Sequence, residues 1–106
     1  MKIVSVVVPV YRSRKTIVEL DSRIRRAFDA TNLEFEIIYV DDRGEDGTRE
    51  IILEQILPRG EAKVIVLSRN FGQANANLAG ISVSKGDYVV TIDDDLQCPP
   101  EEIPRM

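Results

Sequence analysis

The segment YVVTIDDDLQ, residues 88–97, joins a short apolar run to three consecutive carboxylates and a glutamine. Its first half, with Val89, Val90 and Ile92, is typical of a strand that is buried on both faces of a parallel sheet. Three acids at the end of such a strand repel one another unless a positive charge neutralises them. Their oxygen atoms suit a hard cation that is shared with substrate phosphates, so the segment predicts a site for Mg²⁺ or Mn²⁺.

Three earlier segments repeat the apolar half of this pattern, at residues 3–8, 35–40 and 64–67. They are rich in valine and isoleucine, and only the second has a polar interruption, at Glu36. Four short runs of this kind predict four parallel strands.

Helical spacing fills the gaps between these runs. An apolar stripe from Ile17 to Phe28 leaves Asp21 on the polar side. A second helix is expected between Asp46, as its N-cap, and Pro58. A third, over residues 72–84, has small residues that permit close approach to a sheet. The order predicts an α/β fold, a Rossmann-like open parallel sheet with helices on both faces.

The composition of the chain excludes several classes of function. The chain has 106 residues, a net charge of −4, no histidine and a single cysteine, Cys98. The acidic balance argues against nucleic acid as a partner, and the lone cysteine fits a reducing cytoplasm. No apolar run reaches the roughly 20 residues of a membrane span.

Polar residues follow each expected strand, in residues 9–13, 41–47, 68–72 and 93–97. In open α/β sheets ligands bind beyond the carboxyl ends of the strands, so these loops are expected to form one site. Taken singly, Asp41 and Asp42 could equally cap a turn, and Arg69 is more often a surface cation. For the three consecutive acids, a functional role is favoured over a purely structural one. Because no serine–histidine pair, dinucleotide fingerprint or Walker loop is present, phosphates would be held by the metal and Arg69.

Four motifs resemble family 2 glycosyltransferases with the GT-A fold, specifically the branch that uses polyprenyl phosphates. The motifs are VVVPVY at residues 6–11, VDD with DGT at 40–48, LSRNFGQ at 67–73 and DDDLQCPPEEIP at 93–104. The resemblance runs along the whole chain, and the last motif is the most specific. It implies that residues 1–106 are the N-terminal, nucleotide-sugar-binding half of a catalytic domain that is truncated at its C-terminus.

The resemblance also assigns residues. It implies that Asp95 and Gln97 are metal ligands, with Asp93 as a third candidate. Arg69 borders the nucleotide. The implied donor-binding residues are Pro9, Tyr11, Val40, Asp42, Arg69, Asp93, Asp94 and Asp95. Acceptor-side catalytic residues are expected to be absent from this chain.

The implied function is a metal-dependent, inverting transfer of a sugar from a UDP- or GDP-linked donor to an undecaprenyl or dolichyl phosphate. The full protein would act at the cytoplasmic face of the membrane, while the fragment binds the donor without full activity. One alternative is a soluble family 2 transferase that extends a polysaccharide. Another is a receiver-like, Mg²⁺-binding module, although its acids would follow different strands. An exposed sheet edge could also pair two copies of the chain.

Overall fold

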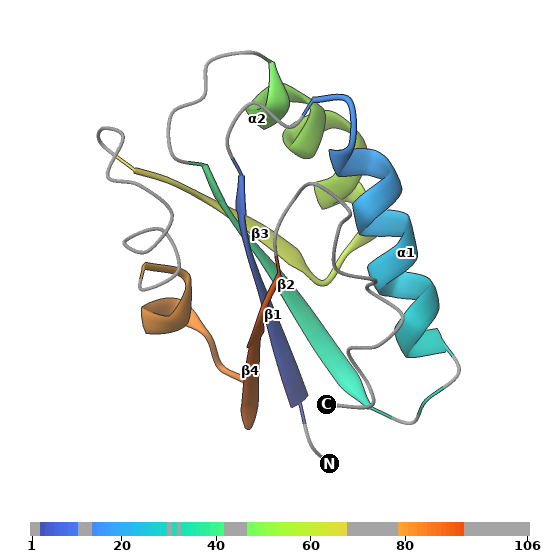
Figure 1. The fold of residues 1–106 in the computed structure, drawn as a ribbon, viewed down its shortest axis with the longest axis vertical. Coiled ribbons are helices and arrows are strands. Elements are labelled where there is room, and N and C mark those ends of the chain that lie inside the picture. Colours follow the sequence, from blue (N-terminus) through green and yellow to red (C-terminus); the bar gives the residue numbers. More distant parts are fainter. Residues whose placement is uncertain are drawn as a thin grey trace.

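The computed structural model of the chain describes residues 3–10, 14–29, 31, 33–41, 47–67 and 79–92. Four strands, β1 (Ile3–Val10), β2 (Glu34–Asp41), β3 (Ala62–Val66) and β4 (Tyr88–Thr91), form one parallel sheet in the order β3-β2-β1-β4 (Figure 1). The chain therefore winds outward from β1 to β3 and then crosses back to place β4 on the other side of β1. The predicted open, parallel α/β sheet is confirmed.

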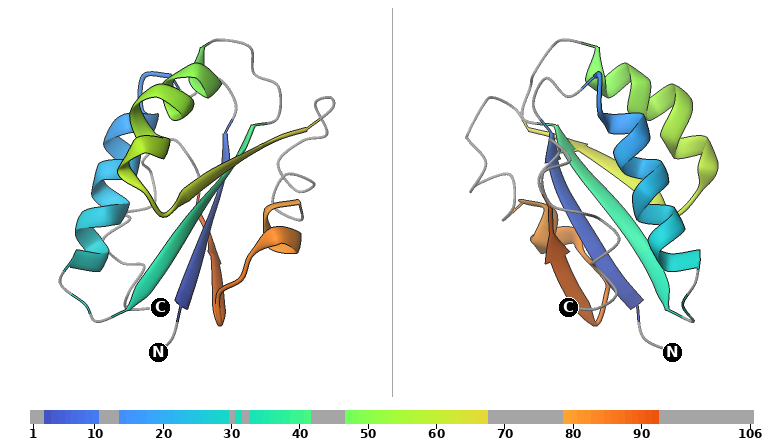
Figure 2. Two further views of the ribbon diagram at one scale, coloured as in Figure 1. Left: turned by 180° about the vertical axis from the view of Figure 1, so that it is seen from behind. Right: turned by 45° about the vertical axis from the view of Figure 1, so that its right-hand side comes forward.

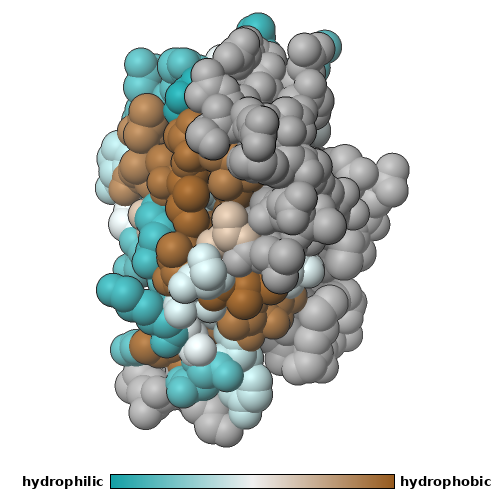
Figure 3. Space-filling view, turned by 90° about the vertical axis from the view of Figure 1, so that its left-hand side faces the viewer, coloured by the Kyte–Doolittle hydropathy of each residue, from teal (hydrophilic) through white to brown (hydrophobic). Residues whose placement is uncertain are grey.

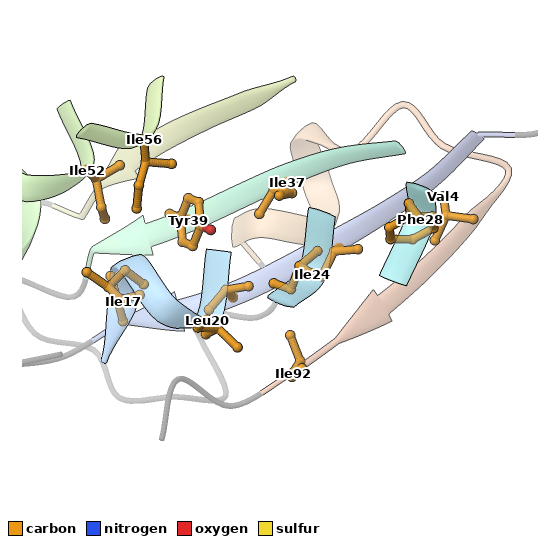
Figure 4. Packing of buried hydrophobic residues seen from close by; sticks show 13 residues of the cluster. Val4, Ile17, Leu20, Ile24, Phe28, Ile37, Tyr39, Ile52, Ile56 and Ile92 are labelled. Atoms are coloured by element: carbon orange, nitrogen blue, oxygen red, sulfur yellow. The ribbon is translucent and has the colours of Figure 1, made fainter. Parts of the chain in front are cut away.

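The first face of the sheet is covered by helix α1 (Ile17–Asp29) and by the helical stretch α2 (Thr48–Ile51), η1 (Ile52–Ile56) and η2 (Leu57–Arg59) (Figure 2). Alternate side chains of β1 and β2 point to this face because successive strand residues alternate sides. They pack with the apolar stripe of α1, as predicted (Figure 4). Labelled members of this core are Val4, Ile17, Leu20, Ile24, Phe28, Ile37, Tyr39, Ile52, Ile56 and Ile92.

The second helical stretch departs from the prediction at both ends. Its N-cap is Gly47, at φ 96°, with no side-chain cap, whereas Asp46 lies outside the described residues. It does not end before Pro58, because the 3₁₀ turn η2 includes that proline and stops at Gly60. Proline is tolerated there because an amide at the start of a helical turn has no partner to lose.

The opposite face has a smaller core of Val7, Ile38 and Val40, covered by the helical residues 79–83. A Cβ atom on Gly80 would lie 2.4 Å from Cγ1 of Val7, so only glycine allows this approach. The expected close packing of small residues is therefore confirmed at residues 79 and 80, while residues 72–78 lie outside the described part.

Both edge strands are more exposed than the sequence predicts. Tyr88 is 52% exposed and Val89 39% exposed, so β4 is not a strand buried on both faces. Figure 3 shows apolar side chains at the surface on the side of the molecule that faces the viewer. An edge strand has only one neighbour, and its apolar residues remain partly uncovered. Pairing of two copies through such an edge stays a prediction.

The prediction that Asp21 lies on the polar side of α1, away from the core, is wrong, because Asp21 is fully buried. It accepts hydrogen bonds from the hydroxyl of Tyr39, from Nε of Arg25 at 2.7 Å and from Nη1 of Arg59 at 2.8 Å. A buried carboxylate needs such partners to offset its lost hydration. The network joins α1 to β2 and to the end of η2.

We expect Tyr39→Phe to lower the free energy of unfolding by about 1 kcal/mol near neutral pH, since one buried hydrogen bond is lost. Burial, with the charge of Asp21, raises the pKa of Tyr39 above its ordinary value of 10.0. Because only the unfolded chain loses the Tyr39 proton readily, the free energy of unfolding is unaffected by this group below about pH 10. Above that pH it falls, by up to about 1.4 kcal/mol for each pH unit. Urea unfolding at several alkaline pH values measures this. The wild type should lose stability faster than the variant, and parallel profiles would contradict the burial of Tyr39.

Candidate functional site

The carboxyl ends of all four strands lie at one edge of the sheet, here called the carboxyl edge and formed by Val10, Asp41, Val66 and Thr91. Val10 pairs with Asp41, and Asp41 pairs with Val66. Thr91 pairs with Val7 rather than with Val10, so β1 and β2 extend beyond the end of β4. Parallel pairing thus brings to one edge the four strand ends after which the polar segments begin in the sequence, as predicted.

Two of the predicted donor-binding residues lie in the described part of the chain. Pro9 on β1 and Val40 on β2 are partners in the strand register, next to the carboxyl edge. Both are buried, and the Val40 side chain packs on the second face under Gly80. They can form the floor of a site.

The other predicted residues directly follow described strand ends but lie outside the described residues themselves. Each belongs to a segment that starts after Val10, Asp41, Leu67 or Ile92. These residues are Tyr11, Asp42, Arg69, Asp93, Asp94, Asp95 and Gln97. In the part of the chain that the structure describes, no three acidic, cysteine or histidine side chains gather to hold a metal.

The start of β4 is held by a polar network on the second face. Glu36 accepts hydrogen bonds from the Ser5 hydroxyl and from the Lys85 backbone amide at 2.6 Å, and its carboxylate lies 3.3 Å from Nζ of Lys63. The Gly86 amide donates to Oγ of Ser5 at 2.8 Å. Burial raises the pKa of Glu36, but these partners outweigh it and hold the pKa below 4.5. The polar interruption at Glu36 therefore attaches the chain before β4 to β1 and β2.

The far end of β4 is also bonded to β1. The Ile92 amide donates to the carbonyl oxygen of Val7 at 3.0 Å, and Asp93 is the next residue. The acidic segment therefore begins directly beyond a hydrogen-bonded residue of the sheet. The network at Glu36 and the ladder of β4 together determine where it begins.

Arg49 is a charged residue at the carboxyl edge that the sequence analysis does not single out. Its Nε lies 3.3 Å from Oδ2 of Asp41, the last residue of β2. Asp41 is buried, so it is more than the exposed turn residue that its position in the sequence suggests. No periodic pattern links the two residues, and only their pairing in space shows the contact.

The described residues also line a cavity of about 340 Å³ between Leu33, Glu34, Phe35 and Glu61. Three of these residues lie at the amino end of β2, away from the carboxyl edge. The cavity therefore does not belong to the predicted site. No helix within the described ranges is both long and apolar enough to cross a bilayer.

Comparison with known sequences identifies the family. The model of glycosyl transferase family 2 matches residues 5–106. The chain is 44% identical over 107 residues to the undecaprenyl-phosphate 4-deoxy-4-formamido-L-arabinose transferase of Aeromonas hydrophila, and 45% identical over 108 residues to that of Pseudomonas savastanoi. These alignments cover 100% of this chain but 33% and 32% of the relatives, so the chain spans about a third of their length.

Solved structures share the fold. The mannosyltransferase PcManGT of Pyrobaculum calidifontis, in complex with GDP-Man and Mn²⁺, has a TM-score of 0.80 and 25% identity. That match covers 93% of this chain and 29% of the mannosyltransferase. TarS of S. aureus has a TM-score of 0.76 and 33% identity, over 90% of this chain and 17% of TarS. The resemblance inferred from the four motifs is confirmed, and the chain belongs to glycosyl transferase family 2.

Proposed function

We propose that residues 1–106 are the donor-binding part of a glycosyltransferase catalytic domain. The observation that carries this proposal is the carboxyl edge, at which all four strands end, and the acidic segment starts directly after the last hydrogen-bonded residue that follows β4. Mn²⁺ and GDP-Man in PcManGT, and UDP bound to TarS, support a nucleotide sugar as the donor.

The acceptor is proposed to be a polyprenyl phosphate, at the cytoplasmic face of a membrane in the full protein. The two relatives described above are undecaprenyl-phosphate 4-deoxy-4-formamido-L-arabinose transferases, which favours this acceptor over a growing polysaccharide.

The residues divide into three groups by role. Pro9, Tyr11, Val40 and Asp42 would surround the base and ribose. Arg69 would border the nucleotide, and Asp93 and Asp94 would lie nearer the donor. Asp95 and Gln97, with Asp93 as a third candidate, would hold the metal. This donor set is made of oxygen atoms alone, which fits Mg²⁺ or Mn²⁺.

The proposed reaction is a displacement with inversion. An oxygen of the acceptor phosphate forms a bond to the anomeric carbon, and the bond from that carbon to the nucleoside diphosphate breaks. A divalent cation held at the carboxyl edge would neutralise charge on the departing diphosphate. The acceptor phosphate is already an anion at neutral pH, so little help from a general base is needed, in keeping with a chain without histidine.

Paramagnetic broadening by Mn²⁺ tests where this site lies. In a spectrum of backbone amides with UDP or GDP present, we expect Mn²⁺ to broaden Val10, Asp41, Leu67 and Ile92. Amides at the opposite ends of the strands, such as Glu34, should keep their line widths. Mg²⁺, which is diamagnetic, is the control. Broadening centred on the amino ends of the strands, or spread evenly over the surface, would contradict the proposed site.

A further inference from the structure

The contact between Asp41 and Arg49 lies where β2 ends and α2 begins. The Asp41 side chain is 4% exposed and that of Arg49 is 31% exposed, so the ion pair is partly shielded from water. Such a pair is stronger than one at the open surface, because less solvent screens it. It joins two elements that the chain itself connects through residues 42–47.

Both partners are attached to fixed backbone. Asp41 pairs with Val10 on one side and with Val66 on the other, and its carbonyl oxygen accepts from the Leu67 amide at 3.0 Å. At the start of α2, the Ile51 amide donates to the Gly47 carbonyl oxygen at 3.1 Å. The ion pair therefore joins two points of fixed backbone, one on each side of the segment 42–46.

The geometry of the pair is poor for stability alone. Nε of Arg49 is buried and makes no hydrogen bond with the residues that the structure describes, although it lies within ion-pair distance of Asp41. A buried donor without a hydrogen bond destabilises the folded state. The contact is therefore better explained by what it holds in place than by the stability that it contributes.

We infer that Arg49 is a positioning residue for the donor site, which acts by holding the start of α2 to the end of β2 and thereby directing Asp42, which lies between them in the sequence. The inference rests on the proposed function, in which Asp42 contacts the base and ribose. The sheet already holds the backbone of Asp41, so what the ion pair adds is the position of the start of α2 relative to it. Arginine suits this task because its planar fork presents several donors in a fixed arrangement.

The chain offers a matched control, because Arg59 also pairs with a buried aspartate. Nη1 of Arg59 lies 2.8 Å from Oδ2 of Asp21, and the two side chains are 34% and 0% exposed. Arg59 lies before the start of β3, away from the carboxyl edge. Arg49→Met and Arg59→Met thus remove the same group from similar surroundings, and only the first lies at the proposed site.

The experiment measures the dissociation constants of UDP and GDP in the presence of Mn²⁺, together with the unfolding temperature. We expect Arg49→Met to weaken nucleotide binding about tenfold, as for the loss of a charged interaction. Arg59→Met should lower the unfolding temperature and leave binding within about twofold of the wild type. Arg49→Lys, which retains the charge, should restore part of the affinity, and it serves for the comparison if Arg49→Met does not fold.

A double variant tests the route through Asp42. If Arg49 acts by directing Asp42, then Arg49→Met should cost little further affinity in a chain that already carries Asp42→Asn. Full additivity would overturn the inference. So would unchanged binding by Arg49→Met beside a wild type that binds nucleotide. A wild type that binds neither nucleotide would instead refute the proposed function, and the inference with it.

Discussion

Asp95→Asn should abolish the dependence of nucleotide binding on Mn²⁺. The substitution keeps the size of the side chain but removes the negative charge that a hard divalent cation requires. Loss of an outer partner of a metal ligand already costs ten- to about a hundredfold in metal affinity, so loss of a ligand itself should cost about a hundredfold or more.

The measurement is a calorimetric titration with UDP and with GDP, at several concentrations of Mn²⁺. Cys98→Ser is the control, because it changes a nearby side chain that has no proposed role, and it should leave the metal dependence intact. If Asp95→Asn binds nucleotide with the same response to Mn²⁺ as the wild type, the metal is held elsewhere.

Gly86→Ala should destabilise the chain by about 3 kcal/mol, at the upper end of what overpacking usually costs. A Cβ atom at residue 86 would lie 2.5 Å from Oγ of Ser5, 2.7 Å from its amide nitrogen and 2.8 Å from the carbonyl oxygen of Ile3. Two of these atoms belong to the backbone of β1, which cannot move aside without breaking the sheet ladder. The start of β4 must therefore shift away from β1.

This shift should also reach the proposed site. The Gly86 amide donates to Ser5, and the Asp87 amide donates to the carbonyl oxygen of Ile3 at 2.7 Å, so both contacts attach β4 at its start. Because the acidic segment follows the other end of β4, we expect weaker nucleotide binding in the presence of Mn²⁺. Urea unfolding and the same titration measure the two effects. Lys85→Ala is the control, since it keeps the backbone amide that bonds Glu36. A Gly86→Ala chain as stable as the wild type would contradict this packing.

The arrangement of strands and the main core were predictable from the sequence because they follow from periodicity. Ile17, Leu20, Ile24 and Phe28 repeat at helical spacing, and all four are buried against the sheet. The valine-rich runs likewise marked each strand. Patterns of this kind report local geometry, which is the same wherever the helix or strand lies in the fold.

Features that depend on partners from elsewhere in the chain were missed. Asp21 was placed on the polar side of α1, yet it is buried because Tyr39 and Arg59 supply donors from β2 and η2. Val89 was expected to be buried, yet it lies on an edge strand. Arg49 carries no local signal at all. In each case the decisive neighbour is distant in sequence, and hydrophobic spacing does not report it.

The predictions about the candidate site are likewise of two kinds. That the four strands would end at one edge followed from their parallel arrangement, and the structure confirms it. The roles of individual residues came from family motifs, and of these residues only Pro9 and Val40 lie in the described part. The roles of Asp42, Arg69 and Asp95 therefore stay predictions that the variants above test.

Titration of the unaltered chain with UDP and with GDP, each with and without Mn²⁺, tests most directly whether the carboxyl edge is a metal-dependent nucleotide site. We expect one of the two nucleotides to bind, with an affinity that falls when Mn²⁺ is removed by a chelator. Failure of both nucleotides to bind, or equal affinity with and without the metal, would contradict the site.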